Sequence, residues 1–188
     1  MEQREIHNYS HMQDEVYDVV NEKGEKVATA TWHEVHAKGL LHATAAALVF
    51  KDASKKEILI KRRSNSMIQK PGLWEYSAGG HILAGQTPEE GVRAELQEEL
   101  FEGRKLPKFV IRPVMKFFNN DIPNNKEILH LFEAIYPGPF FHGRKEVAAP
   151  PKWVKWLDLL ADMRNKPEKY TPVFHNIIEH YQRSQASG

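Results

Sequence analysis

Three glutamates stand close together near the middle of the chain, at positions 95, 98 and 99. On a helix, residues three and four apart share a face, so Glu95, Glu98 and Glu99 would hold their carboxylates side by side. Adjacent carboxylates repel one another unless a cation neutralises them, and ligation by oxygen alone suits Mg²⁺ or Mn²⁺ rather than zinc. The alternative is a solvated acidic face, the commoner state of charged residues. The cluster predicts a divalent metal site.

The residues before the glutamates supply the start of the helix that would carry them. Thr87 can accept a backbone hydrogen bond as the N-cap, Pro88 suits the first helical position, and Glu90 completes a capping box. In the phase that this start sets, a second helix face is apolar and can pack on a core: Val92, Leu96 and Leu100. The sequence therefore predicts a two-sided helix that follows a glycine-rich loop beginning at Gly79 and Gly80.

This stretch resembles the signature of the Nudix superfamily, G-x5-E-x7-R-E-U-x-E-E-x-G-U, where U is a bulky apolar residue. The residues that match in register are Gly80, Glu95, Leu96, Glu98 and Glu99. Three signature positions differ, with Gln86 for the first Glu, Ala94 for the Arg and Phe101 for the late Gly. In the family this Glu and Arg bear on each other structurally, so their joint loss is easier to accommodate than the loss of one. The differences put the rate in question, because preorganised sites lose activity steeply when misplaced.

Nudix enzymes cleave a diphosphate linked to another group, so the resemblance implies a hydrolase that depends on Mg²⁺, with Mn²⁺ as the other option. The substrate would be of the nucleoside diphosphate type or another organic diphosphate. A bound cation would neutralise the diphosphate and deliver a deprotonated water. By this resemblance the metal ligands are the Gly80 carbonyl, Glu95, Glu98 and Glu99, of which Glu98 and Glu99 are expected to be the strongest.

Further residues are expected to act on the water and the substrate. The resemblance implies Glu98, Glu99 and Glu127 as catalytic carboxylates. The general base is open between Glu99 and Glu127, because members of the superfamily place it in different positions.

Candidate substrate-binding residues lie at the end of a predicted strand and in the loop after it. Alternation along the strand should turn one of Arg62 and Arg63 inward, where the resemblance implies contact with the diphosphate. Lys70 is a weaker version of the same idea. Trp74 and Phe118 could stack on a base or line the pocket. The alternative is that the arginines are solvent-facing charges and the aromatic residues belong to the core.

Outside the signature, the chain from about Asp14 to Tyr181 is similar to the branch of the superfamily that includes isopentenyl-diphosphate isomerase. The likeness is carried by the order and spacing of five segments: 18–21, 39–43, 58–63, 71–74 and 170–174. That isomerase needs the cysteine of a Cys-Gly/Ser-His-Pro segment, and Gly79 stands at this position. Isomerisation of a double bond needs a protonating group on each face of the substrate, so isomerase activity is not expected.

The isomerase also binds a metal ion through histidines and through two glutamates of a Glu-Asn-Glu motif. His42 and His81 match these histidines, and His36 is one residue out of register. The motif reads Asn125-Lys126-Glu127, so half of the carboxylate pair is missing. The alternative for the histidines is a structural role.

Three hypotheses from different classes remain. The first is a Mg²⁺-dependent diphosphate hydrolase, and the second is an isomerase-like enzyme that acts on isoprenoid diphosphates. The third is a diphosphate-binding protein whose catalysis has been weakened by the departures from the signature.

Composition limits the class of protein. With 188 residues, 41% of them hydrophobic, we expect one domain at residues 14–188 after a flexible arm at residues 1–13. The absence of cysteine excludes disulfides, Cys-ligated zinc and a thiol nucleophile, and fits a reducing compartment. A net charge of +1 predicts no nucleic acid polymer as partner, and no apolar run approaches the ~18 residues of a membrane span. We expect a cytoplasmic protein with a small-molecule diphosphate substrate and no membrane partner; the oligomeric state is open, with a homodimer as one option.

The elements that would position these residues alternate between strands and helices. A hairpin is expected at 15–20 and 26–31, a helical or loop segment at 33–39, and central strands at 43–50 and 57–63. A loop at 64–74 and a lead-in at 75–78 precede the acidic helix. The expected later elements are strands at 109–118, 127–136 and 153–156, loops at 119–125 and 137–151, and helices at 157–165 and 172–182, the last capped by Thr171. Strands flanked by helices on both sides predict the α/β class, as a Nudix-type α/β/α sandwich with a mixed β-sheet.

Overall fold

The computed structural model describes residues 15–65, 69–141 and 149–186. The first half of the described chain contains β1 (Val16–Val20), β2 (Lys26–Thr31), α1 (Trp32–Lys38), β3 (His42–Phe50), β4 (Glu57–Arg62), β5 (Trp74–Glu75) and β6 (Ala78–His81). The second half contains α2 (Pro88–Phe101), β7 (Ile111–Ile122), β8 (Asn125–Ile135), β9 (Lys152–Lys155), α3 (Trp156–Asn165), a short 3-10 helix (Pro167–Lys169) and α4 (Pro172–Ala186).

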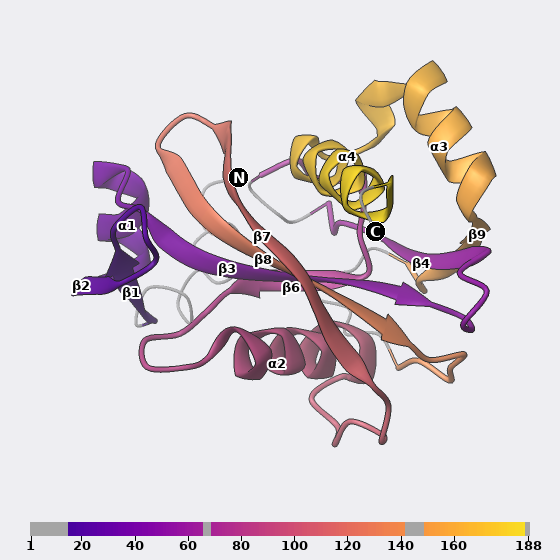
Figure 1. The fold of residues 1–188 in the computed structure, drawn as a ribbon, viewed down its shortest axis with the longest axis horizontal. Helices are drawn as coiled ribbons and strands as arrows, with labels where there is room; N and C mark the ends of the chain where they lie inside the picture. The colour runs from indigo at the N-terminus through magenta and orange to yellow at the C-terminus, as the bar shows by residue number, and fades with distance from the viewer. Residues whose placement is uncertain (1–14, 66–68, 142–148, 187–188) are drawn as a thin grey trace.

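Strand β3 is the centre of the sheet, and it crosses the middle of the molecule in Figure 1. It pairs in parallel with β8 along its whole length, from His42 opposite Glu127 to Phe50 opposite Ile135. Its pairings with β1, β4 and β6 are antiparallel. Its apolar run, which suits a strand covered on both faces, therefore lies in a mixed sheet, as predicted.

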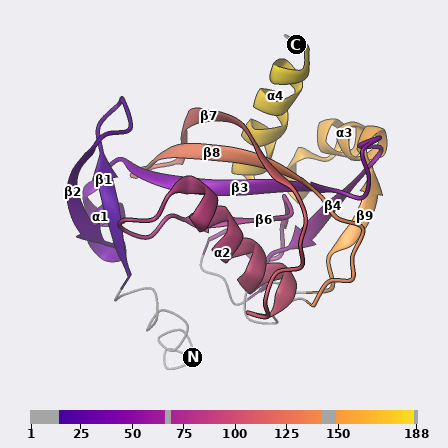
Figure 2. The same ribbon diagram turned by 60° about the horizontal axis from the view of Figure 1, so that its bottom comes forward.

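Alternation along β3 divides the core into two layers. Ala45, Ala47 and Val49 pack with the apolar stripe of α2. Ala46, Leu48 and Phe50 point to the other face, where they pack with residues of α3 and α4. Figures 1 and 2 show α2 on one side of the sheet and α4 on the other. The predicted α/β/α sandwich is confirmed.

The predicted hairpin, central strands and acidic helix are present, but three local predictions are wrong. The polar segment 119–125 is the tip of a long hairpin, because β7 continues to Ile122 and β8 begins at Asn125, with Asn124 in the left-handed region at φ 64°. Two short strands, β5 and β6, lie where only a connecting segment was expected. Thr171 does not cap α4 through its side chain, since its buried hydroxyl has no hydrogen-bond partner among the described residues, and its backbone carbonyl accepts from Phe174 N–H instead.

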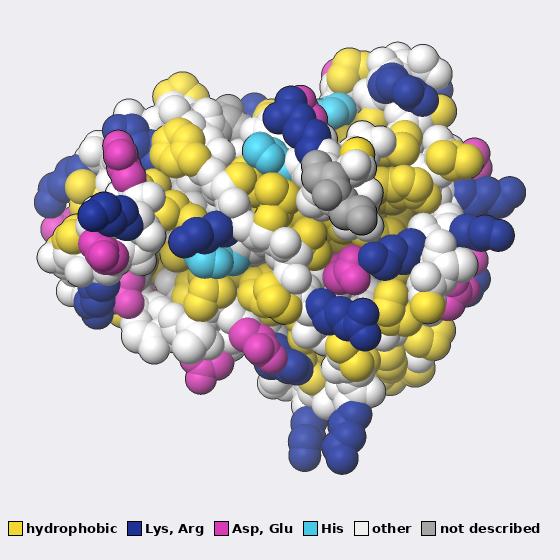
Figure 3. Space-filling model, viewed as in Figure 1, with side chains coloured by type: hydrophobic (Ala, Val, Ile, Leu, Met, Phe, Trp, Pro, Cys, Tyr) yellow, Lys and Arg dark blue, Asp and Glu magenta, His cyan; other side chains and the backbone are white. Residues whose placement is uncertain are grey.

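The remaining sequence-based expectations concern the surface and the chain ends. The predicted arm at residues 1–13 lies outside the described residues. Among the helices of the described ranges, none combines the length and the apolar composition needed to cross a membrane. Figure 3 shows basic and acidic side chains mixed over one face of the molecule. This mixture agrees with the near-zero net charge of the sequence.

Candidate functional site

The acidic helix begins where the sequence predicts. Helix α2 starts at Pro88, with Thr87 as the N-cap in an extended conformation. The Thr87 hydroxyl accepts from the Glu90 N–H at 3.3 Å, and the Glu90 carboxylate accepts from the Thr87 N–H at 2.8 Å. This capping box satisfies backbone donors that a first helical turn leaves without partners. It thereby sets the direction in which the three glutamates point.

The loop before the helix is held by β1 and by its own glutamine. The Ala84 N–H donates to a backbone carbonyl of β1 at 2.7 Å, and the Gly85 N–H donates to the Asp18 carboxylate at 3.0 Å. The Gln86 side-chain oxygen accepts from the Leu83 N–H at 3.1 Å. These contacts hold the loop although the signature Glu and Arg are absent from this sequence.

Glu95 lies directly against the glycine turn. A Cβ atom built on Gly80 would come within 2.7 Å of the Glu95 carboxylate carbon, so a larger residue at position 80 would displace this carboxylate from the turn. Burial and the hydrogen-bonded Glu15 carboxylate raise the pKa of Tyr17, and the charge of Glu95 adds to the effect. Glu98 is exposed on the same helix. The structure therefore brings Glu95 and Gly80 together and leaves Glu98 accessible to solvent.

Glu99 is buried, and its two carboxylate oxygens have different partners. Oε1 accepts from the Lys61 ammonium, and Oε2 accepts from the Gly79 N–H at 2.9 Å. Lys61 belongs to β4, its side chain is 1% exposed, and its Nζ also lies 3.3 Å from a Glu75 oxygen. Glu99 thus connects α2 to both β4 and β6.

The two arginines at the end of β4 differ as strand alternation predicts. The Arg63 guanidinium contacts both carboxylate oxygens of Glu75, at 3.0 and 3.2 Å, and its side chain is largely buried. Arg62 is exposed, and its Nε donates to the Gly72 carbonyl at 2.8 Å. Arg63 is therefore committed to a carboxylate, whereas Arg62 can be reached from solvent.

The other candidate substrate residues are spread over two places. Lys70 is exposed in the loop after β4, in the left-handed region at φ 51°. Trp74 packs against the core from β5, with the Lys152 ammonium 4.0 Å from its ring centroid. Phe118 on β7 is 59% exposed, so it is a surface residue and not a core residue.

Glu127 lies on the sheet face opposite helix α2. It is buried and is the register partner of His42. Its Oε2 accepts from Asn119 Nδ2 at 2.8 Å, and its Oε1 accepts from Asn125 Nδ2 at 2.9 Å. Asn119 in turn accepts from Asn176 of α4 at 2.9 Å. Neutral amides therefore orient this carboxylate, and α4 supports one of them.

Three histidines converge at the N-terminal end of β3. One ligand nitrogen from each of His36, His42 and His81 lies within 4.8 Å of the other two. The Nδ1 atom of His36 donates to the Trp32 carbonyl at 2.8 Å, and that of His42 donates to the Leu40 carbonyl at 2.9 Å. Because a carbonyl only accepts, both contacts place the proton on Nδ1. The Nε2 lone pair of His42 is then available, whereas His36 has a further hydrogen bond with the Asn125 side chain. The form protonated on Nδ1 is the tautomer in which a histidine binds metal through Nε2.

Burial keeps the three histidines neutral. Burial lowers the pKa of His42 to about 4 and lowers those of His36 and His81 as well, that of His81 strongly. The Nε2 atoms of His42 and His81 are buried and have no hydrogen-bond partner within the described ranges. Neutral imidazoles with buried lone pairs are the form that binds a transition metal ion. The donor set therefore fits such an ion.

No room exists for a side chain at Gly79. A Cβ atom there would come within 2.4 Å of the Ala45 carbonyl oxygen, 2.7 Å of Tyr76 Cε2 and 2.9 Å of the Ala46 Cα. The isomerase cysteine could not be placed here without moving the backbone. Burial raises the pKa of Tyr76 well above its usual value, and the charges of Glu99 and Glu127 contribute. The pKa of Tyr76 is therefore affected by carboxylates on both faces of the sheet.

Phe101, the third departure from the signature, is a core residue. It is 3% exposed and stacks at a centroid distance of 6.4 Å with Phe109. Tyr136 and Phe140 lie within 5.9 Å of its ring centroid. At the last residue of α2, where the signature has a glycine, the phenyl ring of Phe101 therefore packs in this aromatic cluster.

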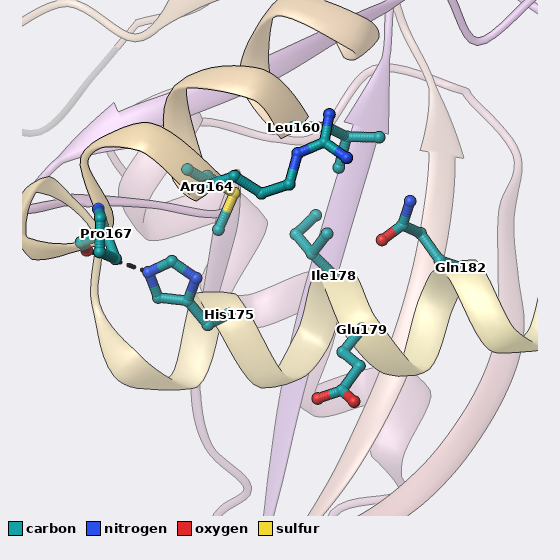
Figure 4. A pocket seen from close by; sticks show the side chains of 8 residues that line it. Leu160, Arg164, Pro167, His175, Ile178, Glu179 and Gln182 are labelled. Atoms are coloured by element: carbon teal, nitrogen blue, oxygen red, sulfur yellow. Dashed lines mark hydrogen bonds between the residues drawn. The ribbon is translucent and has the colours of Figure 1, made fainter.

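A hollow of about 340 Å³ between α3 and α4 lies apart from these residues. Figure 4 shows His175 pointing across it to Pro167, whose carbonyl accepts from His175 Nε2 at 3.0 Å. Its one carboxylate, Glu179, forms an ion pair with Arg183. None of the sequence-predicted site residues lines this hollow.

The patterns in the sequence did not predict a role for Lys61 or for the asparagines around Glu127. A signal for Lys61 was present, because it shares its strand face with Leu59, which packs in the α2 layer. A charge on a buried face needs a partner, and the glutamates of α2 were available. Asn119 and Asn176 carried no comparable signal, because they meet only after α4 packs on β7.

Comparisons with known proteins agree with this geometry. A family model, the NUDIX domain, matches residues 40–174. Nudix hydrolase 3 of Arabidopsis thaliana is 28% identical over 171 residues, a match that covers 86% of this chain and 22% of that protein. Isopentenyl-diphosphate Delta-isomerase 2 of Photorhabdus laumondii is 28% identical over 168 residues, covering 88% of this chain and 91% of that protein.

The fold has solved counterparts as well. A crystal structure of a Deinococcus radiodurans protein aligns with a TM-score of 0.69 and 23% identity, covering 90% of this chain and 99% of that one. This likeness concerns the fold alone. The match to the family model, in contrast, spans most of the chain and includes the glycine turn and the acidic helix. The chain belongs to the NUDIX domain family and is a Nudix hydrolase.

Proposed function

We propose that this Nudix hydrolase cleaves the diphosphate linkage of a small organic diphosphate, such as a nucleoside diphosphate derivative, with Mg²⁺ or Mn²⁺ as cofactor. The observation that carries the proposal is the packing of Glu95 against Gly80, which brings a carboxylate to the backbone of the turn. Glu98 follows on the same helix face. Oxygen ligands of this kind suit Mg²⁺ or Mn²⁺. Such an ion supplies charge neutralisation of the diphosphate and activation of a water molecule.

The carboxylates divide into two roles. Gly80, Glu95 and Glu98 are the proposed metal ligands. Glu99 was also expected among them, but its contacts with Lys61 and Gly79 favour an anchoring role. Neither candidate general base is favoured by its surroundings: the ammonium beside Glu99 opposes proton uptake by that carboxylate, and Glu127 lies on the sheet face opposite the proposed ligands, oriented by Asn119 and Asn125.

The substrate is held by residues at the end of β4 and after it. Arg62 is the proposed diphosphate contact, since Arg63 is committed to Glu75. The exposed guanidinium of Arg62 can form bidentate hydrogen bonds to phosphate oxygens. Lys70 and Trp74 lie in the segment that follows, and we assign them to selection of the group attached to the diphosphate.

A substrate panel with and without Mg²⁺ tests the proposal. Product release is measured for nucleoside diphosphate derivatives and prenyl diphosphates, and Mg²⁺-dependent hydrolysis is expected. Glu98→Gln should lower kcat/KM by about 100-fold or more, because it removes a charged ligand of the metal. Glu89→Gln is the matched control, since Glu89 is an exposed residue of the same helix paired with Arg93. Undiminished hydrolysis in Glu98→Gln would overturn the ligand assignment.

A second function is favoured by one specific observation, the three-histidine cluster. A transition metal ion held by His36, His42 and His81 would suit an isomerase-like enzyme acting on isoprenoid diphosphates. Gly79 opposes this function, since it supplies no thiol and has no space for one. Proton NMR of the prenyl diphosphates in the same panel detects a shifted double bond. A chain that binds the panel compounds without changing them would be a diphosphate-binding protein.

A further inference from the structure

A second groove, of about 510 Å³, lies where the central strands end. Its lining residues come from the segments 53–55, 108–112 and 133–137, which are the turn after β3, the start of β7 with the residues before it, and the end of β8 with the residues after it. Figure 1 shows these segments next to one another on the right-hand side, whereas the histidine cluster lies at the opposite end of β3. None of the proposed metal, catalytic or substrate residues lines the groove, and its volume is in the range of small-molecule sites.

The groove carries an excess of positive charge. Among its described lining residues the one carboxylate is Glu133, whose Oε2 accepts from the Lys55 ammonium at 2.6 Å and from the Tyr181 hydroxyl at 3.2 Å. Arg112 stands opposite Glu133 in the register of β7 and β8, but this carboxylate is already paired with Lys55. Lys108 and Arg112 are exposed, and no ion pair among the described residues includes either of them. Two cations therefore line the groove without a carboxylate in contact.

The other wall of the groove is apolar and well fixed. Phe109 and Tyr136 stack with their ring centroids 5.1 Å apart and their planes at 29°. The Tyr136 hydroxyl donates to the Pro139 carbonyl at 3.3 Å, and Val110 beside Phe109 is 57% exposed. An exposed apolar side chain next to a stacked aromatic pair offers a surface on which a flat ring can be buried. Because the two rings are already ordered, binding requires little further ordering of the protein.

The two walls together select one class of ligand. A terminal phosphate group carries about two negative charges near neutral pH, which matches two cations, and the arginine fork can bind its oxygens bidentately. The apolar wall adds a flat aromatic ring to this requirement. An acidic polymer would need basic surface well beyond two side chains. The net charge of +1 and the mixed charges over the face in Figure 3 offer no such surface.

We propose that this groove is a second, non-catalytic site that binds an organic phosphate, a molecule in which a flat aromatic ring is attached to a phosphate group. Lys108 and Arg112 contact the phosphate, and the ring lies against Val110 and the stacked pair of Phe109 and Tyr136. The site shares no residue with the proposed metal ligands, so it does not depend on the proposed hydrolysis. Its ligand links three segments that are distant in the sequence, and binding therefore stabilises the folded chain.

Nuclear magnetic resonance titration of the full chain tests the proposal, with AMP and naphthyl phosphate as probes. The titration is carried out in EDTA, so that divalent metal ions do not contribute. Saturable changes in the backbone amide shifts are expected at residues 53–55, 108–112 and 133–136, with a rise in Tm. Adenosine lacks the phosphate and ribose phosphate lacks the ring, so each should bind about tenfold or more weakly than AMP.

A pair of double variants with equal changes in net charge tests the two cations. Lys108→Gln/Arg112→Gln should weaken binding of both probes by about tenfold or more, since it removes the charged contacts to the phosphate. The matched control is Lys105→Gln/Lys116→Gln, because these lysines are also exposed but do not line the groove. The control should bind within about threefold of the unchanged protein, since exposed charges at a distance are screened by salt. All four side chains are exposed, so both variants should fold.

The location of the shift changes separates this site from the proposed hydrolase site. Equal weakening in the two double variants, or no changes at the groove with either probe, would overturn the inference. Changes confined to the glycine turn and α2 would also overturn it, and they would leave the proposed function intact. Changes at the groove in a protein that hydrolyses nothing in the substrate panel would support the groove and contradict the proposed function.

Discussion

Buried polar groups are stabilised in opposite ways at two places: the inner end of the acidic helix, at Glu99, and the histidine cluster. At the helix, Glu99 and Glu75 are ionised side chains that the protein neutralises with its own Lys61 and Arg63. At the histidine cluster, the rings are kept neutral by burial, and the Nε2 atoms of His42 and His81 have no partner among the described residues.

The difference shows which region depends on an external ligand. A buried charge without a counter-ion is strongly destabilising, so the inner helix end must be complete when the chain folds. A neutral imidazole loses far less when its second nitrogen is left without a partner. The histidine cluster can therefore form first and bind a ligand later.

Removing the charge at the helix end should have the largest effect on stability. Lys61→Met leaves Glu99 and Glu75 with too little positive charge, and we expect the free energy of unfolding in EDTA to fall by about 3–5 kcal/mol. Urea denaturation measures this change. Lys61→Met/Glu99→Gln should recover most of the loss, and a double variant as unstable as the single one would show that the charge is not the cause.

Adding a side chain at Gly79 should have the next largest effect. Gly79→Cys forces a Cβ atom against Tyr76 and the backbone of Ala46, and overpacking of this kind costs about 1–3 kcal/mol. Thermal unfolding measures the loss, and proton NMR should detect no isomerisation of prenyl diphosphates. Ala53→Cys places the same thiol on an exposed loop and should leave the Tm unchanged. Isomerase activity in Gly79→Cys would mean that the backbone around position 79 moves to accommodate the thiol.

The histidine cluster should make the stability of the protein depend on pH. His42 stays neutral in the folded chain down to about pH 4, whereas an unfolded histidine takes up a proton near pH 6.5. The unfolded state therefore binds more protons as the pH falls, so stability is constant above about pH 6.5 and is lost below it.

The expected loss from His42 is about 2 kcal/mol between pH 6.5 and pH 5, and His36 and His81 act in the same direction. Urea midpoints in EDTA at several pH values measure it. His42→Gln lacks the titrating ring and should show a shallower dependence. Equal slopes for the two proteins would exclude His42 as the source.

Restoring the family signature should have the smallest effect. Gln86→Glu with Ala94→Arg recreates the missing pair, but the loop is already held by Ala84, Gly85 and Gln86 itself. We expect kcat/KM to change by less than about threefold, since the geometry of the site is already fixed. A large increase in rate would show that the loop contacts do not replace the pair.

Local signals in the sequence were sufficient to predict the acidic helix and the central strands. Thr87, Pro88 and Glu90 determine a helix start through contacts within one turn, and the apolar run before Phe50 can only be buried. The hairpin at 119–125 was predicted as a loop because its polar residues fit one. It is extended because β8 is paired with β3 and β7 follows β8.

The site was predictable only where spacing along one element defines it. Glu95, Glu98 and Glu99 were found by helical spacing, and the contact of Glu95 with Gly80 agrees with that prediction. The role of Glu99 depends on Lys61, which lies 38 residues earlier in the chain, and no pattern within α2 reveals such a partner. Thr171 shows the reverse case: its residue type suits capping, but its buried hydroxyl has no hydrogen-bond partner in the part of the chain that the structure describes.

The contact between Tyr76 and Gly79 limits how this chain could evolve a new activity. A cysteine at position 79 collides with the Ala45 carbonyl oxygen and with the ring of Tyr76, so a mutation there alone lowers the stability of the protein. A smaller residue at position 76 would not be enough, because the Ala45 carbonyl oxygen lies only 2.4 Å from the same Cβ position and belongs to the backbone of β3. Such a change would also remove the Tyr76 ring that packs edge to face on Phe174 in the core. A thiol at position 79 therefore requires the backbones of β3 and β6 to move apart, which no side-chain substitution at position 76 supplies.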